Sequence, residues 1–236
     1  MNVFLLAIQS NMSGHGGTTN GTWDGVVPPK CAPNPSILSL APNLTWVPAV
    51  EPLHRDINVN ITFGVGPGML FANSVLAKDP SVGMVGLVPC ALGGSKISSW
   101  GQGSSLYDRL VSRARAAMQG GGKIQAMLWY QGESDTELQD DAELYMGQLV
   151  KFFQDLSCDL ESPSLLIIQV ALASAQGPFL EQVRGAQLRL DLENVKCVNT
   201  QGLELEPDDL HLTSRAKVQL GMMLADSFLH TRSSPP

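Results

Sequence analysis

The chain has 236 residues, 44% of them hydrophobic, and carries a formal net charge of −7 at pH 7. This length and composition predict one α/β domain over residues 1–230, followed by a flexible tail at 231–236. The negative charge and the lack of a lysine and arginine cluster exclude nucleic acid as an expected partner, because phosphate binding needs a basic surface. No run reaches the roughly 20 apolar residues that a membrane-spanning helix needs, so no membrane partner is expected either.

Five short apolar runs recur along the chain at the spacing of β–α units. They cover residues 3–8, 82–88, 124–130, 165–170 and 195–198. Each run is continuously apolar rather than alternating, which is typical of a parallel strand buried on both faces. The first run is too short for a signal-peptide core and has no positive flank. We therefore expect a cytoplasmic protein, or a secreted one if an N-terminal leader precedes Met1.

Segments with helical periodicity lie between and after these runs. They cover residues 69–77, 106–118, 142–156, 179–190 and 216–229. The alternation predicts a three-layer α/β sandwich, with a central parallel sheet of about five strands flanked by helices. Residues 14–68 break the rhythm, since they are rich in Gly, Pro and Asn, with short strands expected at 36–40 and 45–47. Because this segment leaves from the end of the first strand, we expect it to fold over the mouth of a site there.

The first apolar run is followed at once by Ser10. Open parallel sheets present their chemistry at the carboxyl ends of the strands, so the Ser10 hydroxyl is a candidate nucleophile. Such a hydroxyl needs a base, and Asp208 and His211 are spaced to place a carboxylate on an imidazole. The alternative is a solvated acidic loop with an exposed histidine. Asp209 could also compete with Asp208 for the orienting role.

Two further strand ends carry groups that suit acyl transfer. After the second apolar run, Gly93 and Gly94 allow backbone N–H groups to approach a developing oxyanion. After the third run, Gln131 can donate an amide hydrogen to the same oxyanion, and Glu133 could hold a loop or a sugar hydroxyl. The alternatives are a plain strand-to-helix turn for the glycines, and helix capping for Glu133 and Asp135.

No metal or cofactor is expected from the sequence. The four cysteines are Cys31, Cys90, Cys158 and Cys197. They are scattered, with no C-x-x-C pair and no histidine at metal-ligand spacing, so a zinc site is not expected. The sequence leaves two alternatives for these cysteines: free thiols, or one or two disulfides. The run Gly-His-Gly-Gly at 14–17 resembles a phosphate cradle, but no Gly-Lys-Ser/Thr follows it, so a P-loop is excluded.

Taken together, these blocks resemble the plant carbohydrate esterases of the SGNH hydrolase superfamily, in the sialate O-acetylesterase-like (SASA) group. The matching blocks spread over nearly the whole chain, at residues 9–12, 28–34, 64–69, 86–91, 128–135 and 208–213. The resemblance implies an SGNH or flavodoxin-like sandwich. It also implies that the protein hydrolyses acetyl or other short acyl esters on carbohydrate, through an acyl-enzyme and without a cofactor. It leaves the oligomeric state open.

The same resemblance assigns roles to the catalytic candidates. Ser10 would be the nucleophile, His211 the general base and then the general acid, and Asp208 the carboxylate that orients His211.

The resemblance also implies an oxyanion hole. Its donors would be the backbone N–H of Ser10, an N–H of Gly93 or Gly94, and the side chain of Gln131. Asn11 and Glu133 would support the substrate or the loops around it.

One position departs from the family pattern. The family usually reads Gly-Gln-Ser up to the nucleophile, and this chain has Ile8 in place of the glycine. A β-branched residue disfavours a positive φ and crowds a close backbone approach, so the Ser10 amide would be misaimed if the position needs that room. This supports a second hypothesis, in which a catalytically weakened esterase serves as an acylated-glycan binding module.

Overall fold

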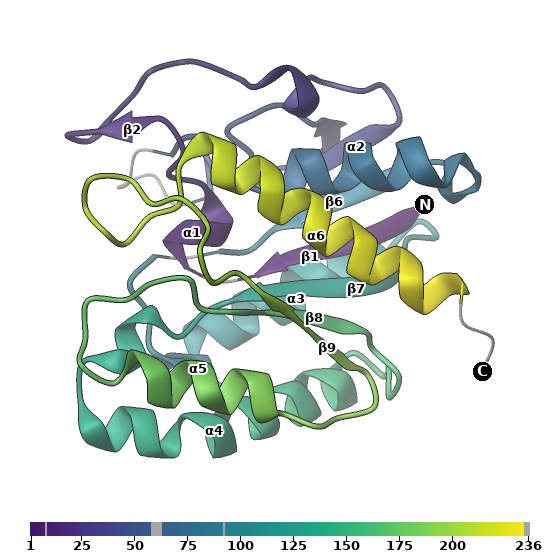
Figure 1. The fold of residues 1–236 in the computed structure, drawn as a ribbon. Helices are drawn as coiled ribbons and strands as arrows, with labels where there is room; N and C mark the ends of the chain where they lie inside the picture. Colours follow the sequence, from purple (N-terminus) through teal and green to yellow (C-terminus); the bar gives the residue numbers. More distant parts are fainter. Residues whose placement is uncertain (8, 58–62, 92, 234–236) are drawn as a thin grey trace.

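The computed structural model describes residues 1–7, 9–57, 63–91 and 93–233. Its main sheet has seven strands in the order β5-β4-β6-β1-β7-β8-β9 (Figure 1). Neighbouring strands run parallel, except for the antiparallel pair of β4 and β5 at one edge. The strands are β1 Asn2–Ala7, β4 Ile37–Leu40, β5 Trp46–Pro48, β6 Val85–Pro89, β7 Lys123–Tyr130, β8 Ile167–Ala171 and β9 Val195–Asn199. A separate small hairpin joins β2 Thr18–Thr19 to β3 Thr22–Trp23.

The predicted α/β sandwich is confirmed, and its sheet is larger than the five strands expected. Each of the five apolar runs overlaps a parallel strand, and the two short strands expected within residues 14–68 correspond to β4 and β5 beside β6. The strand expected at 82–88 begins only at Val85. The reason is the 3-10 turn Pro80–Val82, in which the Asp79 side chain accepts the N–H of Ser81.

Helices cover both faces of the sheet (Figure 1). They are α1 Ser10–Ser13, α2 Gly68–Lys78, α3 Ser105–Met118, α4 Gln139–Asp159, α5 Leu180–Arg189 and α6 Ser214–Ser233. The helices α2 and α6 pack together on one face, whereas α3 and α4 cover the other, with α5 packed against α4. Because α6 continues to Ser233, the expected tail at 231–236 begins with helical residues, and 234–236 lie outside the described part of the chain.

The central strand β1 is anchored by an aromatic cluster on one face of the sheet. The ring of Phe4 meets Phe71 of α2 and Phe228 of α6 edge to face, with both centroid separations at 4.9 Å. Such pairs stabilise a core beyond the apolar area that they bury. They tie both helices of this layer to β1, the strand that precedes Ser10.

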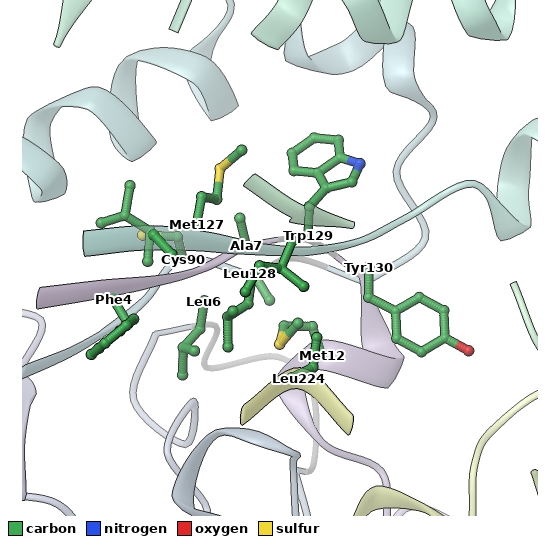
Figure 2. Packing of buried hydrophobic residues seen from close by; sticks show 14 of the residues in the cluster. Phe4, Leu6, Ala7, Met12, Cys90, Met127, Leu128, Trp129, Tyr130 and Leu224 are labelled. Atoms are coloured by element: carbon green, nitrogen blue, oxygen red, sulfur yellow. The ribbon is translucent and has the colours of Figure 1, made fainter. Parts of the chain in front are cut away.

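Strand β7 contributes side chains to the core on both faces of the sheet. Figure 2 shows Met127 and Trp129 on one side of this strand and Leu128 and Tyr130 on the other. All four side chains are fully buried, and Trp129 packs against Phe152 of α4 at a centroid distance of 4.5 Å. Burial on both faces explains why the strand reads as one continuous apolar run.

The irregular segment between α1 and α2 begins and ends at the same place. Gly14 has φ 103, and a Cβ added there would lie 2.6 Å from the carbonyl oxygen of Gly64 and 2.7 Å from the nitrogen of Gly66. Gly16 and Val65 exchange two backbone hydrogen bonds of 3.1 and 2.9 Å. The start of the segment is therefore fastened to its end, directly beside α1.

The four cysteines, all of which the structure describes, are free thiols. Cys31 and Cys90 are buried, and Cys158 and Cys197 are exposed. Of the alternatives that the sequence left open, the structure thus has free thiols. A search of the described residues found no helix with the length and apolar character needed to cross a membrane.

We expect Gly14→Ala to lower the free energy of unfolding by about 3 kcal/mol or more, because alanine disfavours this φ and its Cβ would meet backbone atoms that cannot move aside. Gly21→Ala is the matched control, since Gly21 also has a positive φ, 74, but no atom within 4 Å of an added Cβ. The control should lose only about 1 kcal/mol. Denaturant unfolding measures both variants, and equal losses would contradict the packing argument.

Candidate active site

The candidate nucleophile follows a strained backbone position. Ser10 is the first residue of α1, and Gln9 before it has φ 54 and ψ 169. A residue other than glycine in such a conformation costs about 1–3 kcal/mol and persists only where its surroundings hold it. The sharp turn ends β1 and leaves the Ser10 side chain partly exposed at the carboxyl edge of the sheet.

The Gln9 side chain supplies that support. Its amide nitrogen donates to the carbonyl of Ser95 at 3.2 Å and to the hydroxyl of Ser134 at 2.9 Å. Its amide oxygen accepts the backbone N–H of Glu133 at 3.2 Å. Gln9 is buried and so links the turn at Ser10 to the loops that follow β6 and β7.

Ser10, His211 and Asp208 form a continuous chain of polar contacts. The Ser10 Oγ lies 2.8 Å from Nε2 of His211, and the Nδ1 of His211 lies 2.6 Å from Oδ2 of Asp208. Because a carboxylate can only accept, the Nδ1 proton is assigned to the Asp208 side, which leaves Nε2 free to accept the Ser10 hydroxyl proton. The three side chains are thus arranged to deprotonate the serine.

Asp208 is held as an ionised, oriented acceptor. Its Oδ1 accepts the backbone N–H groups of Leu210 at 3.0 Å and of His211 at 2.9 Å. Partial burial opposes ionisation, but the hydrogen bonds from His211 and Leu210 outweigh it and hold the pKa of Asp208 below its ordinary value. Asp209 occupies a turn with φ 54, and Asp208 is the residue that meets the imidazole.

The Asn11 side chain joins the two distant segments of the site. Its Nδ2 donates to the carbonyl of Leu210 at 3.2 Å, and its Oδ1 accepts the N–H of Leu212 at 2.9 Å. Leu210 and Leu212 flank His211, so the residue after Ser10 holds the backbone on both sides of the candidate base.

A buried lysine lies beneath this junction. The Lys217 ammonium group on α6 donates to the backbone oxygen and to Oδ1 of Asn11, both at 2.6 Å. The Nδ2 of Asn11 also donates to Oε1 of Glu133 at 3.1 Å. Burial lowers the pKa of Lys217 to about 7 and raises the pKa of Glu133 to about 7, and the opposite charge of each opposes the other's shift. Asn11 and Glu133, the two supports expected from the sequence, contact each other here, and their role in supporting the substrate or the loops stays a prediction.

Lys217 was not predicted as a site residue, although its position in the sequence carries a signal. Lys217 lies on the apolar stripe of α6, at helical spacing from the buried Leu220 and Leu224. A charged residue inside such a stripe indicates a buried partner.

The amide of Gln131 is engaged within the protein. Its Nε2 donates to the carbonyl of Ser95 at 3.2 Å and to the carboxylate of Asp135. Asp135 also accepts the N–H of Ile97 at 3.1 Å, so it fastens the loop after β6 rather than capping a helix. Gln131 can therefore act as an oxyanion donor only if one of its two bonds is exchanged. That role stays a prediction.

The other expected oxyanion donors lie at the same edge of the sheet. Gly93 and Gly94 form the turn after β6, where Gly94 has φ 70. Ser10 begins a helix, and the first amides of a helix have no partner within it. Ile8 lies outside the described residues. Within the described part of the chain, no group of three or more His, Cys, Asp or Glu side chains is arranged to hold a metal ion.

We expect Glu133→Gln to flatten the dependence of stability on pH. In the unfolded chain this carboxyl releases its proton near pH 4.5, whereas burial keeps it protonated in the folded protein up to about pH 7. The free energy of unfolding therefore falls as the pH rises through this window, because the folded state binds more protons. Glutamine cannot titrate, so the fall should be shallower in the variant.

Denaturant unfolding at several pH values between 4.5 and 7 measures this slope. Glu137→Gln is the control, since Glu137 is exposed in the same loop. Asp135, whose pKa burial raises to about 6, contributes a remaining slope of the same sign in every variant. Parallel curves for Glu133→Gln and the parent protein would contradict the assignment.

Several known proteins resemble this chain in sequence and in fold. A family described as carbohydrate esterase, sialic acid-specific acetylesterase, matches residues 1–230. A probable carbohydrate esterase of Arabidopsis thaliana is 50% identical, over 96% of this chain and 90% of that protein. An X-ray structure of an Arabidopsis thaliana protein has a TM-score of 0.95 at 48% identity, covering 97% of this chain and 98% of that chain.

A more distant structure shares the fold. The carbohydrate acetylesterase of Xanthomonas citri has a TM-score of 0.70 at 21% identity, covering 97% of this chain and 56% of that chain. The resemblance seen in the sequence blocks is confirmed by the family match and by the plant relative. The chain belongs to the carbohydrate esterase family described as sialic acid-specific acetylesterases.

Proposed function

We propose that this protein is a serine esterase that removes acetyl or other short acyl groups from carbohydrate through an acyl-enzyme. The observation that carries the proposal is the chain of contacts from Ser10 through His211 to Asp208. The family supports an ester of a carbohydrate as substrate, and the name of the Xanthomonas citri neighbour supports an acetyl ester.

The first half of the reaction transfers the acyl group to the protein. The Ser10 oxygen attacks the ester carbonyl carbon while its proton passes to Nε2 of His211, and Asp208 stabilises the imidazolium that forms. The tetrahedral intermediate then collapses. His211 gives the proton to the departing sugar oxygen, and the acyl group remains on Ser10 as an ester.

The second half returns the serine. His211 takes a proton from water, whose oxygen attacks the acyl carbonyl, and the bond to Ser10 breaks as His211 returns that proton to the Ser10 oxygen. The products are a carboxylic acid and the free sugar hydroxyl. Each proton that leaves Ser10 or water reaches a product or returns to Ser10, so the cycle balances.

The negative charge on the tetrahedral oxygen needs hydrogen-bond donors. The proposed donors are the N–H of Ser10, an N–H of Gly93 or Gly94, and the amide of Gln131. One such donor is worth about 3 kcal/mol of transition-state stabilisation. The Ser10 N–H, placed at the start of α1, is the donor that the fold supports most directly.

We expect Ser10→Ala and His211→Ala each to lower kcat by roughly 10³-fold or more, because each removes a group that takes part in bond formation. The measurements are release of 4-nitrophenol from 4-nitrophenyl acetate and release of acetate from a panel of acetylated polysaccharides. Ser112→Ala is the control, since Ser112 is exposed on α3. Undiminished turnover in Ser10→Ala would contradict the proposal that Ser10 is the nucleophile.

Ile8 is the observation that favours a second candidate, a weakened esterase that binds acylated glycans. A misaim of about 1 Å at the nucleophile can cost on the order of a hundredfold in rate. Because Ser10 and His211 lie in hydrogen-bond contact, we expect Ile8→Gly to change kcat/KM by less than about threefold. The assay with 4-nitrophenyl acetate measures it, and a gain near a hundredfold would instead favour the binding module.

A further inference from the structure

The imidazole of His15 lies flat on the imidazole of His211. The two ring centroids are 4.3 Å apart and the ring planes are 11° from parallel. His15 belongs to the Gly-His-Gly-Gly run, for which a P-loop is excluded and which has no part in the proposed reaction. This contact is therefore unassigned.

The backbone around His15 is held in place from several sides. Gly14 makes the turn that only glycine fits, and Gly16 pairs with Val65. The hydroxyl of Thr18 donates to the His15 carbonyl at 2.7 Å and lies 3.4 Å from Nδ1 of its ring. The ring position thus follows from a fixed loop.

His15 presents an uncharged face to His211. The charged and titratable groups that act on it are His211, Lys217 and Asp208. Burial, followed by the charges of His211 and Lys217, lowers the pKa of His15 to about 4, and Asp208 opposes this only in part. At neutral pH the ring is therefore neutral and does not repel the imidazolium that the reaction forms on His211.

The contact supplies a restraint that the hydrogen bonds of His211 lack. The bonds to Ser10 and Asp208 both lie in the plane of the His211 ring, because imidazole N–H groups and lone pairs do. In-plane bonds resist sliding of the ring more than tilting out of the plane. A flat ring stacked on one face opposes the tilt.

We propose that His15 is a positioning residue for the catalytic base, which keeps the ring of His211 in one plane with Ser10 and Asp208 during proton transfer. This inference rests on the proposed esterase function. It assigns no proton transfer to His15, since two stacked parallel rings cannot hydrogen-bond to each other.

Three substitutions separate a flat face from simple bulk. Phenylalanine keeps a flat ring, leucine fills space without one, and alanine does neither. We expect His15→Ala and His15→Leu to lower kcat for 4-nitrophenyl acetate by about fivefold to thirtyfold with little change in KM, and His15→Phe to stay within about threefold of the parent. His230→Ala is the matched control, since His230 is exposed near the end of α6.

A second readout does not depend on turnover. The chain has four histidines, so two-bond proton–nitrogen spectra of the rings can be assigned with a His211→Gln variant. We expect His211 to show one sharp tautomer, protonated at Nδ1, in the parent and in His15→Phe. Its ring signals should broaden or average in His15→Ala and His15→Leu.

The outcomes decide the inference separately from the function. If the parent protein lacks activity that depends on Ser10, the proposed function fails, and the ring spectra still decide the role of His15. If His15→Ala does not fold, as judged by thermal unfolding, the comparison of His15→Leu with His15→Phe decides it. The inference is overturned if the leucine variant matches the parent in kcat and spectrum, or if the phenylalanine variant is as impaired as the leucine variant.

Discussion

The side chain of Asn11 holds the site together, because it joins segments that are 201 positions apart in the sequence. It is fully buried, and its amide donates twice and accepts twice. Leaving any of these groups unpaired inside the protein would cost about 1–3 kcal/mol, so the network favours one arrangement of both segments. The contact between Ser10 and His211 therefore depends on a buried polar junction beneath it.

The charges around this junction are balanced within the protein. Lys217 lies on the α6 side and Glu133 on the β7 side, with the neutral amide of Asn11 between them. In a medium of low dielectric constant, each charge alone would carry a large desolvation cost, and the opposite charge nearby lowers that cost. The backbone oxygen of Asn11, one residue after Ser10, is held by the buried amine of Lys217. Burial lowers the pKa of Lys217 to about 7, so the amine that holds the residue after the candidate nucleophile is only partly charged at neutral pH.

Much of the fold could be predicted, because apolar runs and helical periodicity are local signals. Ser10, Asp208 and His211 could be named as candidates, because strand ends and residue spacing are visible in the sequence. The one-turn helix α1 was not expected, since four residues are too few to show a period. The strained backbone of Gln9 and the hydrogen bond from Ile97 to Asp135 could not be predicted, because they depend on which loops meet in space. Lys217 shows the same limit, since its stripe indicated burial but not the identity of its partner.

The antiparallel strand β5 has a consequence for association between molecules. A sheet that ended at β4 would expose a row of unpaired backbone groups to any other chain. The three-residue β5 occupies that row and itself ends at Pro48, which has no N–H to offer a neighbour. The irregular segment that begins beside the nucleophile therefore also terminates the sheet at this edge, with a short strand that offers little to edge-to-edge pairing.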